Sequence, residues 1–209
     1  MDAAKPFKFR RVAFLGYSTA VPQEKLYKDA EETAKLVAEA GYVVVNGGGY
    51  GIMEASSRGA KSVGGHVIGV TFEPKGATVF EGRNPNNPMD QEISVPNYVK
   101  RTLKLLELGD IYVIYNGGTG TISEFGMAWG LARLYFGHHK PLVLFGAFWE
   151  EIILTFKKHM LMRPEEFLVY RIVDTPKQAM DAIQTFEGEV AKNDHVHYEV
   201  TPDEKAFTI

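Results

Sequence analysis

Short apolar runs alternate with longer amphipathic stretches along most of the chain. The runs are rich in valine and isoleucine and apolar at successive positions, which is typical of parallel strands covered by helices on both faces. We expect strands at Val12–Leu15, Tyr42–Val45, His66–Val70, Ile111–Tyr115, Pro141–Phe145 and Val169–Val173.

The stretches between these runs show the spacing of amphipathic helices. A helix is expected over Glu24–Ala40, because its apolar residues form one stripe and Gly41 is placed to end it. Pro96 begins another helix, whose buried stripe we expect to include Val99, Leu103 and Leu106. The remaining helices are expected at Met53–Ser62, Ser123–Tyr135, Phe148–Met160 and Lys177–Phe186.

The alternation of strands and helices predicts the α/β class, as a single Rossmann-like doubly wound parallel sheet flanked by helices. We expect this domain to span residues 1–188 and to be followed by a polar C-terminal tail at 189–209. The stretch Phe72–Asp90 is rich in proline and glycine, and so long a loop in a domain is usually functional, for example as a lid.

Composition and charge narrow the function classes. The 209 residues include no cysteine, which excludes disulfides, thiolate catalysis and cysteine-ligated metals. The net charge of −3 does not indicate a nucleic-acid-binding protein, which is usually basic. The charged N-terminus lacks the apolar core of a signal peptide, and no apolar run could span a bilayer. We therefore expect a cytoplasmic protein without nucleic-acid or membrane partners, and we predict no metal site.

Three unusual loops follow expected strands, at the sheet edge where doubly wound folds bind ligands. In the first, Gly16–Ala20, hydroxyl groups such as that of Ser18 suit ligand binding, although a plain glycine turn with capping hydroxyls explains this loop alone better. In the second, Asn46–Met53, three consecutive glycines let the main chain approach another group closely. A tight turn would explain one or two of these glycines.

The third loop, Asn116–Glu124, is the most informative. Its glycines leave backbone N–H groups bare at a helix N-terminus, which makes an anion site, and the hydroxyl of Thr121 could cap the helix or donate to a phosphate. No Gly-Lys-Ser/Thr follows, so the loop is not a Walker motif. By position alone, Glu124 is best explained as a capping glutamate and Arg101 as a solvated helix arginine.

Two of these segments resemble motifs of the "Lonely Guy" (LOG) family. Gly47–Met53 is similar to its GGGxxGxM segment, and Asn116–Glu124 to its signature PGGxGTxxE. The resemblance covers about Val12 to Ile153. LOG proteins are phosphoribohydrolases that cut a nucleoside 5′-monophosphate, such as AMP or a cytokinin form, into free base and ribose 5-phosphate.

The resemblance implies roles for individual residues. Arg101 and Glu124 would be catalytic, a phosphate would bind at Gly117, Gly118, Gly120 and Thr121, and the substrate would contact Gly16, Ser18, Gly47, Gly48, Gly49 and Met53. It also implies a homodimer.

The chain departs from the family pattern at two positions, with Asn116 for the signature proline and Thr102 for the lysine after the arginine. These changes keep open a second function, that of a non-catalytic nucleotide or molybdenum-cofactor carrier on the same fold. We expect no cofactor. The lysine decarboxylase label often given to the family is not supported, because no lysine lies in the three loops for a pyridoxal phosphate Schiff base.

Overall fold

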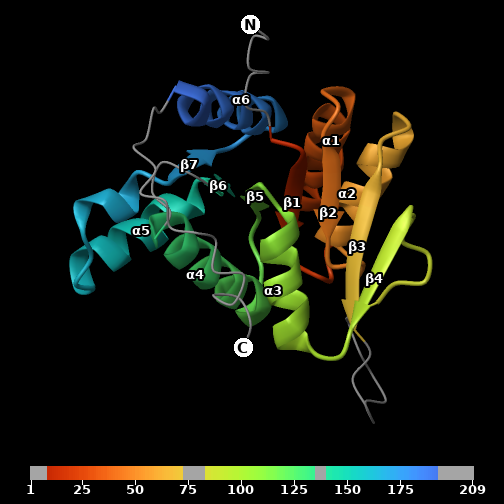
Figure 1. Cartoon of the computed structure of the whole chain (residues 1–209), viewed down its shortest axis with the longest axis horizontal. Coiled ribbons are helices and arrows are strands. Elements are labelled where there is room, and N and C mark those ends of the chain that lie inside the picture. The colour runs from red at the N-terminus through yellow and green to blue at the C-terminus, as the bar shows by residue number, and fades with distance from the viewer. Residues whose placement is uncertain (1–8, 73–82, 135–139, 193–209) are drawn as a thin grey trace, which may run out of the picture.

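Seven parallel strands form one sheet in the order β4-β3-β2-β1-β5-β6-β7, with helices on both faces (Figure 1). The computed structural model describes residues 9–72, 83–134 and 140–192. The sequence prediction of a Rossmann-like doubly wound α/β sheet is confirmed.

Six strands coincide with the predicted apolar runs to within one or two residues. They are β1 (Arg11–Leu15), β2 (Val43–Asn46), β3 (Val67–Phe72), β5 (Ile111–Ile114), β6 (Leu142–Phe145) and β7 (Tyr170–Val173). The seventh, β4 (Gln91–Val95), was not predicted. It pairs only with β3 at the edge of the sheet, and its exposed Gln91, Glu92 and Ser94 remove the apolar signal of a buried strand.

The described α-helices also follow the sequence pattern, with differences at their ends. They are α1 (Lys25–Glu39), α2 (Ile52–Ser62), α3 (Tyr98–Leu108), α4 (Thr119–Leu134), α5 (Phe148–His159) and α6 (Pro176–Lys192). The short 3₁₀ helix η1 (Pro164–Phe167) was not predicted.

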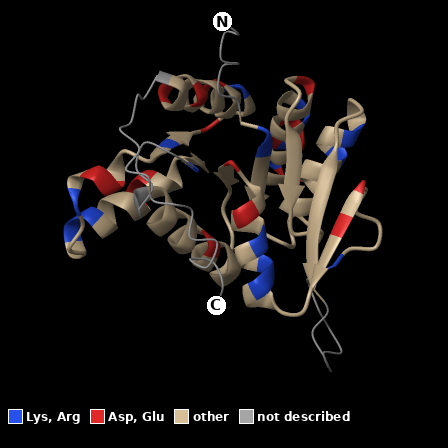
Figure 2. Cartoon of the chain, in the orientation of Figure 1, with Lys and Arg blue, Asp and Glu red and all other residues tan. Residues whose placement is uncertain are grey.

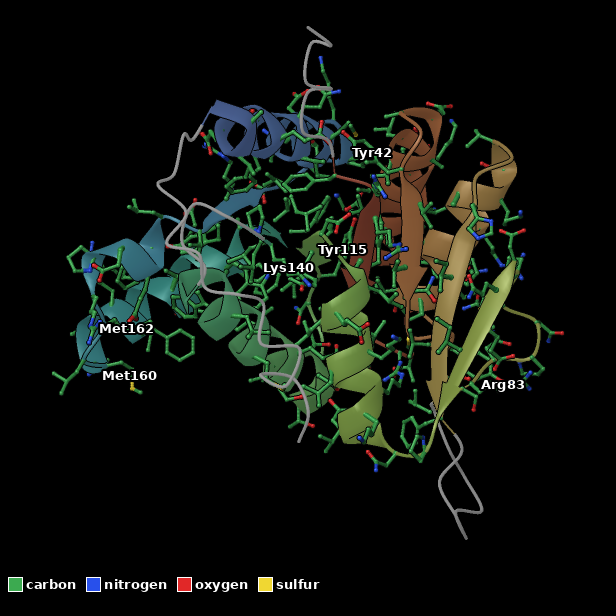
Figure 3. All side chains as sticks on the ribbon, in the orientation of Figure 1. Tyr42, Arg83, Tyr115, Lys140, Met160 and Met162 are labelled. Atoms are coloured by element: carbon green, nitrogen blue, oxygen red, sulfur yellow. The ribbon has the colours of Figure 1, made fainter. Side chains whose placement is uncertain are left out.

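The buried face of α3 differs from the prediction. Val99 is 61% exposed, whereas Arg101 and Leu105 are buried with Leu106. The sequence pattern misplaced this face because one of its central members is a charged residue, which apolar spacing does not count. Asn97 caps the helix by accepting a hydrogen bond from the Lys100 N–H at 2.9 Å, and at the other end Lys140 (Figure 3) donates to the carbonyls of Leu106 and Glu107.

Two hydrophobic cores lie on opposite faces of the sheet. Helices α1, α2 and α6 cover one face, and α3, α4 and α5 cover the other. Strand β1 supplies both cores, since Phe14 points to the first face and Leu15 to the second.

The strand order has its switch point at β1 and β5. These strands are neighbours, and from them the chain order runs outward in opposite directions, to β4 on one side and β7 on the other. At such a switch point the adjacent strand-to-helix loops diverge and leave a crevice.

The C-terminal region is described only in part. Helix α6 continues through Gly188 to Lys192, so the first residues of the expected tail are helical, and residues 193–209 lie outside the described ranges. Within those ranges, no helix combines the length and apolarity that crossing a membrane requires.

Candidate functional site

The three glycine-rich loops meet at the switch point and are tied together by backbone hydrogen bonds. The N–H of Tyr17, in the first loop, donates to the carbonyl of Asn116 in the third at 2.9 Å. The carbonyl of Tyr17 accepts from the N–H of Ile52 in the second loop at 3.0 Å. Gly51 makes this contact possible, because it has a φ of 62° and a Cβ there would overlap the Tyr17 carbonyl.

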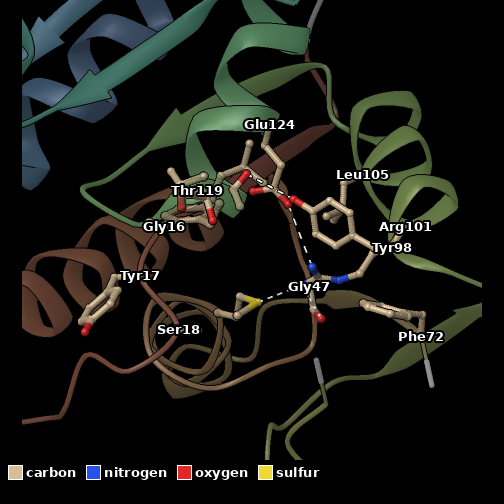
Figure 4. Close-up of a pocket in the computed structure, with 16 residues that line it drawn as sticks. Gly16, Tyr17, Ser18, Gly47, Phe72, Tyr98, Arg101, Leu105, Thr119 and Glu124 are labelled. Atoms are coloured by element: carbon tan, nitrogen blue, oxygen red, sulfur yellow. Dashed lines mark hydrogen bonds and ion pairs between the residues drawn. The ribbon is translucent and has the colours of Figure 1, made fainter. Parts of the chain in front are cut away.

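A cavity of about 300 Å³ opens between these loops, the end of β3 and the start of α3 (Figure 4). Its lining includes nine residues that the sequence singled out: Gly16, Ser18, Gly47, Met53, Arg101, Gly118, Gly120, Thr121 and Glu124. Three others, Gly48, Gly49 and Gly117, lie outside the lining. The sequence pointed to no role for the other seven lining residues, Phe14, Leu15, Tyr17, Phe72, Tyr98, Leu105 and Thr119. Tyr17 and Thr119 lie in loops that it singled out, whereas the other five belong to no motif.

Gly48 and Gly49 are held from outside the cavity. The N–H of Asn84 donates to the Gly48 carbonyl at 2.9 Å, and the Asn87 side-chain amide donates to the Gly49 carbonyl at 2.8 Å. These asparagines belong to the second half of the long predicted loop, which therefore braces the glycine turn. Residues 73–82 of that loop, which a lid would include, lie outside the described ranges.

The N-terminus of α4 forms one wall of the cavity. The helix begins at Thr119, four residues earlier than predicted, so Thr119, Gly120 and Thr121 form its first turn. The N–H groups of a first turn have no carbonyl partner within the helix and lie at the positive end of its dipole. This wall can therefore hold an anion.

Glu124 lies on the second turn of α4 and faces the interior of the site. It is 7% exposed. A capping glutamate occupies the third helical position, whereas Glu124 is the sixth, so the capping interpretation is wrong. Burial raises the pKa of Glu124 to about 7, and the charge of Arg101 acts in the opposite direction.

Arg101 is also buried, at 7% exposure, so its interpretation as a solvated helix arginine is wrong. Its Nε donates to the Val70 carbonyl at 3.0 Å, and its Nη2 donates to the Gly47 carbonyl at 3.0 Å and to the Met53 sulfur at 3.2 Å. These acceptors are neutral, so they hold the guanidinium without cancelling its charge.

The charges of Arg101 and Glu124 face each other across a short gap (Figure 4). Arg101 Nη1 lies 4.0 Å from Glu124 Oε1, longer than a hydrogen bond. The two charges therefore attract while the carboxylate oxygens stay able to bind another group. Burial lowers the pKa of Arg101, but a guanidinium remains protonated in proteins.

The two departures from the family motifs lie off the cavity. Asn116 is exposed and uses its backbone carbonyl to bind Tyr17, a contact that proline could also make. Thr102 is 2% exposed and is absent from the cavity lining.

No lysine lines the cavity in the described part of the chain. Among the residues that the structure describes, no three or more histidine, aspartate or glutamate side chains are arranged to hold a metal ion.

Comparison with known proteins gives a family and several relatives. Residues 10–163 match the SLOG cluster4 family. An uncharacterized protein of Archaeoglobus fulgidus is 32% identical over 123 residues, which are 59% of this chain and 77% of that protein. A rice protein (Oryza sativa subsp. japonica) named as a probable cytokinin riboside 5′-monophosphate phosphoribohydrolase is 29% identical over 140 residues, 66% of this chain. The match spans only 54% of the rice protein's length.

Among solved structures, the molybdenum cofactor binding protein of Rippkaea orientalis aligns with a TM-score of 0.63 and 23% identity. The alignment covers 84% of this chain and 96% of that protein. At this identity the likeness concerns the fold.

Proposed function

The chain belongs to the SLOG cluster4 family, and on that premise we propose that it is a phosphoribohydrolase of nucleoside 5′-monophosphates. It would cleave the N-glycosidic bond of AMP or a cytokinin-type nucleotide to give free base and ribose 5-phosphate. One observation carries the proposal: a buried carboxyl, that of Glu124, lies 4.0 Å from a buried guanidinium in the cavity into which a helix N-terminus opens.

The N-terminus of α4 would bind the 5′-phosphate. Gly118, Gly120 and Thr121 line the cavity there, and two glycines leave the main chain accessible to phosphate oxygens. Because Gly120 and Glu124 are one helical turn apart, they share a face of α4. A phosphate bound at Gly120 would thus place its ribose beside Glu124.

Glu124 would act on the sugar. Cleavage of the C1′–N bond sends the bonding electrons to the base and leaves positive charge on the ribose, which a fixed carboxylate stabilises. Water adds to C1′ and gives a proton to Glu124. The departing base nitrogen takes up a proton from solvent, and Glu124 later returns its proton to solvent, so the carboxylate is regenerated. A pKa of about 7 suits proton transfer near neutral pH.

Arg101 would keep Glu124 ionised and oriented, whereas the N-terminus of α4 would bind the phosphate. The Nε of Arg101 is occupied by the Val70 carbonyl, and its Nη2 by the Gly47 carbonyl and the Met53 sulfur. These contacts favour an electrostatic role over that of a phosphate clamp.

Incubation with AMP and chromatographic detection of adenine tests this function, with Glu124→Ala as the comparison. We expect release by the unaltered protein and a loss of about 10²–10³-fold in the variant. Absence of release, or equal release by both proteins, would refute the mechanism. AMP binding without release would favour the second candidate, a non-catalytic carrier. The reason to consider a carrier is the likeness in fold to a molybdenum cofactor binding protein.

We also propose that the protein is a homodimer that packs through α4. The outer side of this helix presents Ile122 (59% exposed) and Met127 (37% exposed), and Cβ atoms at Gly126 and Gly130 would meet open space. Figure 2 shows the ribbon of α4 mostly without charge colours, in contrast to α5. An apolar helix face with two glycines allows close approach of a second copy.

A further inference from the structure

Tyr98 borders the same cavity as Arg101 and Glu124, although no motif in the sequence points to it. It is the first residue of α3, one helical turn before Arg101, so the two side chains share a face. Its phenol oxygen lies 2.8 Å from Ser123 Oγ and 3.3 Å from the Gly120 carbonyl oxygen, both in α4. In Figure 4 the phenol end of Tyr98 points toward the side of the cavity where Glu124 lies.

The phenol of Tyr98 keeps hydrogen-bonding capacity for a ligand. A phenol donates one hydrogen bond and accepts two. The Gly120 carbonyl can only accept, so Gly120 and Ser123 together use at most the donor and one acceptor position of Tyr98. At least one acceptor position remains, and the side chain is 36% exposed.

Two other polar side chains of the lining are less available as acceptors. Arg101 has donors only and uses Nε and Nη2 for backbone carbonyls, and Thr121 is only 6% exposed. Phe72 packs edge-to-face against the Tyr98 ring, with ring centroids 6.1 Å apart, and so fixes the ring's direction.

We propose that Tyr98 is a specificity-determining residue that accepts a hydrogen bond from the 2′-hydroxyl of the bound ribose. The cavity then takes ribonucleotides in preference to 2′-deoxyribonucleotides. This inference rests on the proposed function, in which C1′ faces Glu124. The 2′-hydroxyl sits on the carbon next to C1′, and Tyr98 contacts Gly120, which shares the α4 face of Glu124.

Titration calorimetry with AMP, 2′-dAMP and 3′-dAMP tests the proposal, in a Glu124→Gln background that prevents turnover. In that background we compare Tyr98 intact, Tyr98→Phe and the control Tyr50→Phe. Tyr50 is 45% exposed but lies outside the cavity lining. With Tyr98 intact, AMP should bind about 5- to 10-fold more tightly than 2′-dAMP. Tyr98→Phe should remove most of this preference, and Tyr50→Phe should keep it.

A ribose preference that survives in Tyr98→Phe, or a loss confined to 3′-dAMP, would overturn the inference. Base release from AMP is measured separately, with Glu124 intact. A Tyr98-dependent preference without any release would support the inference while refuting the phosphoribohydrolase. Failure of AMP to bind at all would overturn both.

Discussion

The guanidinium of Arg101 occupies the space that a side chain on Gly47 would need. A Cβ on Gly47 would overlap Arg101 Nη2 and lie 2.7 Å from the Met53 sulfur. Gly47, the first of the three consecutive glycines, therefore leaves room for the Arg101 side chain. In this way the glycine segment positions Arg101 opposite Glu124.

Gly47→Ala should therefore displace Arg101 and reduce activity strongly, although the substitution adds only one methyl group. We expect kcat/KM for AMP to fall by about 10²–10³-fold, and the free energy of unfolding to fall by about 1–3 kcal/mol because of overpacking. Steady-state kinetics and urea unfolding measure the two effects.

Gly188→Ala is the matched control. A Cβ at Gly188, in α6, would have no atom within 4 Å. This variant should keep full activity and unfold at the same or slightly higher urea concentration. Equal activity in Gly47→Ala and Gly188→Ala would contradict the role assigned to Gly47.

The fold could be predicted from the sequence because its signals are local. Valine-rich runs and glycine turns determine six of the strands, whereas β4 was missed because a polar edge strand lacks such a signal. The meeting of Arg101 with Gly47 could not be predicted from spacing, since 54 residues separate them. Family motifs pointed to Arg101 and Glu124, but no local pattern revealed the burial of these charges or the place of Tyr98.

Activity should depend on the ionisation of Glu124. Because the proposed base is the carboxylate, kcat/KM should be low in acid and rise through a pKa of about 7. In Arg101→Met the loss of the neighbouring positive charge should raise the pKa of Glu124 further, so the rise in activity should move to higher pH. Rate profiles between pH 5 and pH 9 compare the two proteins, and a profile unchanged by the substitution would argue against the pairing.

The ionisation of Glu124 should also affect stability, which should fall as pH rises, whereas activity should increase. The pKa of Glu124 is raised by folding from an ordinary 4.5 to about 7, so the native state holds a proton that the unfolded state has lost between these values. The free energy of unfolding should therefore decrease as pH rises from about 4.5 to about 7, by roughly 3 kcal/mol for this group.

Glu124→Gln isolates that contribution. The amide is similar in size and does not titrate, so this part of the pH dependence should disappear and the variant should be relatively more stable at pH 8. Urea unfolding at pH 5 and pH 8 measures the difference. The same slope in both proteins would show that Glu124 does not carry the raised pKa.

The proposed dimer makes a prediction about α4. Met127→Asp should place a charge in the interface and convert the dimer to monomer, because an unpaired charge is costly to bury. Val63→Asp is the control, since Val63 has the same 37% exposure but follows α2 on the other face of the sheet. Light scattering after gel filtration should give a monomer for Met127→Asp alone.

In the proposed mechanism α4 holds the phosphate while Glu124 faces the sugar. A crystal structure of the Glu124→Gln protein with AMP would show both contacts. We expect the phosphate within hydrogen-bonding distance of backbone N–H groups between Gly118 and Thr121, and C1′ next to the side chain at position 124. A phosphate bound away from the α4 N-terminus, or a ribose turned away from that side chain, would contradict the account.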